Sequence, residues 1–146
     1  MLKQSLLLTL FLTLAGPLFA EGKVNTTFFG NKAIEGYDPV AYFQQDKAVE
    51  GKKEFKHEWM DANWHFSSAD NRDLFAADPE KYAPQYGGYC AYAVSQNSTA
   101  GIEPDQFTIV DDKLYLNYNS KIQKKWTENR DEYIRSADKN WPAVID

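Results

Sequence analysis

Residues 54–66 read EFKHEWMDANWHF, and this stretch decides the fold class. Two short aromatic runs, 54–59 and 63–66, flank a turn-rich centre, and this pattern is typical of a β-hairpin. We expect Trp59 to pair with Trp64 across it. The pairing predicts a small antiparallel sheet with one apolar face.

Side chains alternate between the two faces of a strand, so the expected pairing also assigns the histidines. One face holds the aromatic residues and the first histidine, namely Phe55, His57, Trp59, Trp64 and Phe66. His57 is therefore predicted to face the core. His65 is predicted to face solvent, opposite Glu58.

The segments before this hairpin contain one short expected helix. Asp38 followed by Pro39 is typical of an N-cap and a first-turn proline, which predicts a helical turn through Tyr42. Residues 46–53 are expected to form a charged loop. Residues 21–36 are expected to form a polar lead-in with one short strand at 26–29.

The segment after the hairpin is expected to be helical. Ser67 and Asp70 resemble a capping box, which predicts a helix that ends at Asp78. Pro79 then begins another short turn through Tyr82. Beyond an irregular, glycine-containing loop, residues 89–95 suit a short buried helix.

A second hairpin is expected from strands 107–110 and 114–118. Ser120 is expected to cap a final helical region, in which Ile122, Trp126, Tyr133 and Ile134 keep helical spacing up to Trp141. Strand pairs mixed with short helices predict a small single domain of the α+β class. We expect this domain to span 37–142, with a tail at 143–146.

The N-terminus has the layout of a cleavable secretory signal. Lys3 precedes an apolar run at 5–14, and Ala20 is a small residue just before a polar segment. The alternative is a retained membrane anchor, but the apolar run is shorter than the roughly 20 residues that span a bilayer. We expect residues 1–20 to be removed, leaving an exported protein, periplasmic or secreted, without a stable membrane span.

The charge balance argues against nucleic acid as a partner. The chain has 16 Lys and Arg against 21 Asp and Glu, a formal net charge of −5. Binding to phosphates needs a basic stripe that releases counterions. The densest basic segment, 121–125, is followed by Glu128, Asp131 and Glu132, so it is interpreted as a solvated helix face.

The chain has a single cysteine, Cys90, so no internal disulfide can form. Cys90 is predicted to lie at the start of a short helix, where backbone N–H groups and the helix dipole favour a thiolate. Such a thiolate could ligate a soft metal or attack an electrophile. The alternative is a small, buried, inert side chain. His57 is the natural second ligand, or else a histidine satisfied within the core.

Six segments in this order resemble the YHS domain proteins in their exported longer form, and together they cover nearly the whole chain after residue 20. They are residues 36–43, 66–72, 78–82, 86–91, 114–117 and 140–142. Asp112 stands where the resemblance favours a glycine in a hairpin turn.

Shorter YHS modules are small metal-binding domains found beside copper transporters and other metal proteins. Their cysteines follow Asp-Pro-Val and lie in a Phe-Cys-Ser-x-x-Cys run. This chain has Ala41, Ser67 and Asn71 at those places. The resemblance therefore implies no metal role at these three places. The chain does keep two residues of the longer form, Cys90 and, in a His-x-Trp strand, His57.

These observations predict a non-enzymatic exported binding module. Cys90 and His57 are its candidate ligands for copper, zinc or another soft or borderline metal, and a metal-handling protein is a candidate partner. Asp38, Tyr86, Tyr89 and Trp59 are candidate residues lining the site. The alternatives are a thiol-reactive or redox protein that uses Cys90, and a structural or protein-interaction domain in which Cys90 is inert.

Overall fold

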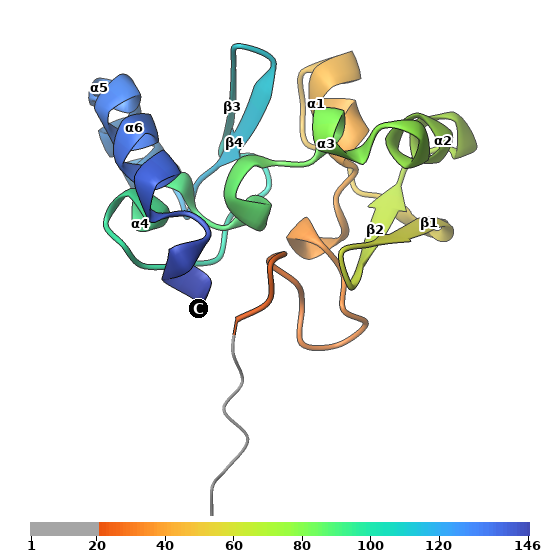
Figure 1. Ribbon diagram of the computed structural model, residues 1–146. Coiled ribbons are helices and arrows are strands. Elements are labelled where there is room, and N and C mark those ends of the chain that lie inside the picture. Colours follow the sequence, from red (N-terminus) through yellow and green to blue (C-terminus); the bar gives the residue numbers. More distant parts are fainter. Residues whose placement is uncertain (1–20) are drawn as a thin grey trace, which may run out of the picture.

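A computed structural model describes residues 21–146, and the expected signal peptide lies outside these residues. The chain forms the expected small α+β domain with two separate two-stranded antiparallel sheets (Figure 1). The first half contains η1 (Ile34–Gly36), α1 (Pro39–Gln45), β1 (Lys52–Trp59), β2 (Ala62–Phe66), α2 (Ala69–Ala77) and α3 (Pro79–Tyr82). The second half contains η2 (Gln85–Gly88), α4 (Ala91–Ser95), β3 (Phe107–Val110), β4 (Lys113–Leu116), α5 (Ser120–Glu128), α6 (Arg130–Asn140) and η3 (Ala143–Ile145).

The first hairpin is built on a tighter turn than the sequence predicted. Trp59 pairs with Ala62, and His57 pairs with Trp64, so the expected pairing of Trp59 with Trp64 is wrong by two residues. A shift of two residues keeps every side chain on its face. The predicted apolar face is therefore retained, with Ala62, Trp64 and Phe66 buried.

His65 lies on the opposite face of this hairpin from His57, as predicted, but it is not fully exposed. It pairs with Lys56 rather than with Glu58. Gly51 packs so closely on the backbone of His65 that a Cβ at that glycine would clash. His65 is therefore half-buried.

Two helix caps lie one residue away from the expected position, the first of them after it and the second before it. Ser68, not Ser67, caps α2 by accepting a hydrogen bond from the Asn71 backbone N–H. Asn119, not Ser120, caps α5. The expected final helical region is two helices, which meet at Asn129.

The other element boundaries follow the sequence more closely. Asp38 caps α1, and α3 begins at Pro79 after Asp78, as predicted. The helix expected at 89–95 begins two residues later, at Ala91. The strand expected at 114–118 runs instead over Lys113–Leu116.

Residues 21–36, expected to form a polar lead-in, pack against the rest of the domain. Val24, Ala33 and Ile34 are buried in the same apolar cluster as the first hairpin. The strand expected at 26–29 is absent, because residues 28–31 form a turn and only a single bridge joins Thr26 to Ala33. Ile145 is likewise buried, so the expected tail is packed too.

β4 joins the two apolar clusters of the domain. Leu114 and Leu116 lie in the cluster that contains the first hairpin, whereas Tyr115 lies in the cluster with Trp126 and Ala137. Alternate residues of a strand point to opposite faces, so β4 is buried on both sides. No helix within residues 21–146 has the length and apolar character needed to cross a bilayer.

Candidate functional site

Cys90 lies in the interior, at the N-cap position of the five-residue helix α4. Its side chain is 1% exposed, and its thiol donates a hydrogen bond to Asn117 Oδ1 at 3.5 Å. Burial raises the pKa of the Cys90 thiol, and the hydrogen bonds from neighbouring backbone groups do not offset this effect. The expectation of a favoured thiolate at this position is therefore wrong.

Asn117 completes the surroundings of the thiol and is itself fully buried. The same Oδ1 accepts the backbone N–H of Tyr92 at 3.1 Å, and the Asn117 amide donates to Gln123 Oε1 at 2.8 Å. Each polar atom near Cys90 thus has a partner within the fold. The thiol is therefore both buried and hydrogen-bonded within the fold.

His57 lies in a different part of the molecule from Cys90. Its ring packs against Phe75 of α2, with 6.1 Å between ring centroids. Figure 1 shows β1, which carries His57, and α4, which follows Cys90, at opposite ends of the domain. The structure does not bring the two expected ligands together, and within residues 21–146 no group of three or more His, Cys, Asp or Glu could hold a metal ion.

Asp38 is fully buried, and both of its carboxylate oxygens serve the fold. Oδ1 accepts the backbone N–H groups of Val40 and Ala41 at 2.9 and 3.2 Å. Oδ2 accepts the Ser67 backbone N–H, the Ser67 hydroxyl and the Asn71 amide at 2.8, 2.7 and 2.8 Å. Asp38 therefore ties α1 to the start of α2.

The same network brings together the places at which the YHS resemblance marks cysteines. Ser67 and Asn71 both donate side-chain hydrogen bonds to Asp38, and Ala41 donates through its backbone. Hydrogen bonds to a carboxylate hold this junction in the present chain. None of the side chains at those three places is a soft metal ligand.

Tyr89 and Trp59, both candidate lining residues, lie in separate places. The Tyr89 hydroxyl donates to the carbonyl oxygen of Gly22 at 2.8 Å, so it holds the N-terminal segment to the domain. Trp59 lines a cleft of about 460 Å³ together with Tyr86, the remaining candidate. Of the four expected lining residues, only Trp59 and Tyr86 therefore line the same cleft.

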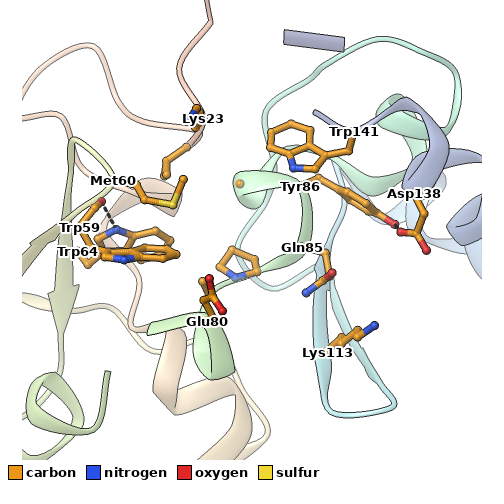
Figure 2. A pocket seen from close by; sticks show the side chains of 14 residues that line it. Lys23, Trp59, Met60, Trp64, Glu80, Gln85, Tyr86, Lys113, Asp138 and Trp141 are labelled. Atoms are coloured by element: carbon orange, nitrogen blue, oxygen red, sulfur yellow. Dashed lines mark hydrogen bonds between the residues drawn. The ribbon is translucent and has the colours of Figure 1, made fainter. Parts of the chain in front are cut away.

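This cleft, which we call the aromatic cleft, lies between the first hairpin and the C-terminal helices. Figure 2 shows Trp59, Trp64 and Met60 on one side, with Tyr86 and Trp141 on the other. Its volume falls within the range of roughly 300–1,000 Å³ that is typical of small-molecule sites. The cleft therefore has the size and lining of a binding site.

The hairpin side of the aromatic cleft is a cluster of tilted and edge-to-face aromatic rings. The Trp59 and Trp64 rings lie 5.9 Å apart, and Phe75 packs 5.7 Å from Trp59. The Trp64 indole N–H donates to the carbonyl oxygen of Trp59 at 3.1 Å. The half-buried Trp59 ring is thus held with part of its surface open to the cleft.

The opposite side is built around Tyr86. Its hydroxyl donates to Asp138 Oδ1 at 2.8 Å, and its ring lies 6.2 Å from Trp141 and 6.0 Å from Tyr115. Burial, followed by the hydrogen bond to Asp138, raises the pKa of the Tyr86 phenol. The phenol therefore stays protonated and keeps the ring in place.

The backbone is unusual on both sides of the aromatic cleft. Met60 and Tyr86 adopt positive φ angles of 50° and 59°, which are uncommon for bulky side chains. Gly87 follows with φ 63°, and a Cβ there would clash with the backbone carbonyl of Lys23. This close approach lets the segment at Lys23 line one end of the cleft.

The rim of the aromatic cleft carries both signs of charge. Lys23 and Lys113 are its cations, and Glu80 and Asp138 are its anions. Sequence analysis missed all four, because surface charges in separate segments carry no pattern that brings them together. Trp141 was predicted only as a helix end, although a large aromatic residue at a helix end could have signalled a packing role.

Comparisons of the chain with protein-family models, with curated proteins and with solved structures found no match. The resemblance to YHS domain proteins therefore rests on the sequence segments alone.

Proposed function

We propose that the chain is an exported binding domain that holds a small, planar, partly apolar ligand in the aromatic cleft. The observation that carries this proposal is the pair of aromatic walls, the half-buried Trp59 on one side and the half-buried Trp141, backed by the buried Tyr86, on the other. A flat ring between such walls gains contact area and favourable offset stacking.

The rim charges suit polar substituents on such a ligand. Lys23 and Lys113 offer ammonium groups, and Glu80 and Asp138 offer carboxylates. The Asp138 carboxylate already accepts the Tyr86 hydroxyl through one oxygen. An apolar centre with a few polar groups at its edge is the usual composition of a small-molecule site.

The positive φ angle of Tyr86 also supports this proposal. A bulky residue costs conformational energy in this backbone region, and such strain concentrates at ligand sites. Tyr86 lines the aromatic cleft, whereas the positive φ of Met60 belongs to the turn of the first hairpin. Metal binding through Cys90 and His57 gains no comparable support, because the thiol is buried and the imidazole lies at the other end of the domain.

Titration with two fluorescent fused-ring probes tests the proposal. Anilinonaphthalene sulfonate carries an anionic group, whereas N-phenylnaphthylamine is uncharged. We expect saturable binding of both, and Trp59→Ala should weaken each by about tenfold, the effect of one lost aromatic contact. Tyr118→Ala, which removes an exposed aromatic residue outside the cleft, should leave both affinities unchanged.

Rim variants keep the test independent of folding. Lys23→Glu and Lys113→Glu alter exposed side chains and should weaken binding of the sulfonate more than binding of the uncharged probe. Lys121→Glu on α5 is the matched control. Equal affinities across all of these variants would show that the probes bind elsewhere, and the proposal would fail.

A further inference from the structure

Phe28 and Phe29 form an exposed apolar tip on the loop that precedes η1. Their side chains are 91% and 82% exposed, and their rings pack edge to face with centroids 4.9 Å apart. Figure 1 shows this segment, in orange, as a loop that projects beside the first hairpin. Two adjacent phenylalanines without core contacts are a costly surface feature that indicates an interaction site.

The loop that carries this tip is held by hydrogen bonds. The Asn63 side chain donates to the carbonyl oxygen of Gly30 at 3.0 Å, and the Asn63 backbone N–H donates to Asn31 at 2.9 Å. Asn31 in turn donates to the carbonyl oxygen of Asp61. These bonds hold the loop that carries the two rings against the turn of the first hairpin.

A basic hollow adjoins the tip. Phe29 lines it together with Lys32, Lys53 and Lys56. Glu50 is the one carboxylate among its lining residues, and within residues 21–146 none of the three lysines forms an ion pair. The hollow therefore carries excess positive charge on a chain whose formal net charge is −5.

His65 lines the same hollow, and its pKa responds to the positive charge of the lysines there. Its pKa is lowered first by burial and then by the charges of Lys32, Lys56 and Lys53. Glu54 and Glu58 flank Lys56 along β1, and Glu54 lines an adjoining hollow together with Lys53 and Lys56. His65 consequently remains neutral near physiological pH and adds no charge of its own.

We propose that the Phe28–Phe29 tip and the three lysines dock this domain on an anionic lipid surface. Aromatic rings on a projecting loop insert at the boundary between headgroups and acyl chains, while nearby lysines contact anionic headgroups. The shape favours lipid over a folded protein partner, because a projecting tip matches a deformable surface. This role is independent of the aromatic cleft.

Co-sedimentation with vesicles tests the proposal on a chain that begins at Glu21. Both apolar clusters are built from residues 24–145, so this chain retains the whole described core. We compare neutral phosphatidylcholine vesicles with vesicles containing one third phosphatidylglycerol, at low and high salt. We expect binding to the anionic vesicles, and high salt should weaken it.

Variants separate the two parts of the surface. Phe28→Ser/Phe29→Ser should weaken binding by at least about tenfold, and Lys53→Gln/Lys56→Gln by about fivefold per lysine. Tyr118→Ser and Lys121→Gln/Lys124→Gln alter exposed residues elsewhere and should have no effect. All these positions are exposed, and thermal unfolding checks that each variant is folded.

Three outcomes would overturn the proposal. The first is no binding to anionic vesicles, and the second is equal binding to neutral ones. The third is a concentration-dependent dimer in sedimentation velocity that the Phe28→Ser/Phe29→Ser variant abolishes, which would assign the tip to a second copy of the chain.

Discussion

Cys90 illustrates how burial decides the chemistry of a single residue. The sequence places the thiol at a helix start, and this position alone favours a thiolate. The structure adds complete burial and a hydrogen bond to Asn117, and the pKa rises instead. Sequence position predicts the local dipole, but it cannot predict how many distant segments cover a side chain.

We therefore expect Cys90 to resist labelling in the folded protein. Reaction with a chromogenic disulfide reagent at mildly alkaline pH should be at least about a hundredfold slower than in concentrated urea, because only opened molecules expose a thiolate. The control is Tyr118→Cys in a Cys90→Ala background, which should react rapidly. Similar rates for folded and unfolded protein would instead support the thiol-reactive hypothesis.

Asp38 shows what sequence can and cannot predict at one position. Asp before Pro correctly predicted an N-cap, since that role depends on neighbours in the chain. The bonds from Ser67 and Asn71 depend on a contact across about thirty residues. A residue expected to line a site is consequently a structural carboxylate, whose loss would leave several buried donors without a partner.

The two hairpins explain why strand register was hard to predict. Each closes through a two-residue turn whose central residues have positive φ, Met60 and Asp61 in the first and Asp111 and Asp112 in the second. Such turns usually contain Asn-Gly or Asp-Gly. Without a glycine, the first turn resembled a longer connection, and the pairing of Trp59 was wrong for that reason.

The second turn predicts a stabilising substitution. Asp112→Gly should raise the free energy of unfolding by about 0.5–1 kcal/mol, because glycine adopts positive φ without steric cost. The YHS resemblance favours glycine at the same place. The change is measured by urea denaturation with a constant slope.

A substitution at the next residue provides the control for this prediction. Lys113 occupies the exposed first position of β4, where the backbone is extended and no positive φ is needed, and the control variant is Lys113→Gly. It should destabilise the protein by about 0.5–1 kcal/mol. A loss of stability in both variants would mean that the Asp112 side chain contributes more than its backbone conformation costs.

At the scale of the whole molecule, the aromatic cleft is the feature that sequence analysis could not assemble. Its walls come from β1, from η2 and from the residue after α6, and the N-terminal segment closes one end. Trp59 and Tyr86 were both identified as candidate lining residues, but for a site around Cys90 and His57. Only the packing of segments far apart in sequence places them across a common space.

Buried tyrosines give the whole molecule a predictable response to alkali. Burial raises the pKa of Tyr42, Tyr86 and Cys90 in the folded state above their ordinary values. The Tyr42 hydroxyl donates to the carbonyl oxygen of Pro104 at 2.7 Å, so its proton is also held by a bond. In the unfolded chain the thiol has a pKa of about 8.5 and the phenols have pKa values of about 10.

The sign of the effect follows from these protons. The unfolded chain releases them at a lower pH than the folded protein does, so stability is complete below the unfolded pKa values and is lost as pH rises above them. The free energy of unfolding should fall by about 1.4 kcal/mol per pH unit for each such group once its unfolded pKa is passed. Urea denaturation from neutral pH to about pH 11 measures this slope. Tyr42→Phe should reduce this slope by the contribution of one group, and it also removes the hydrogen bond to Pro104. A stability that stays constant over this range, or tyrosinate absorbance showing that Tyr42 and Tyr86 ionise before the protein unfolds, would contradict the burial of these phenols.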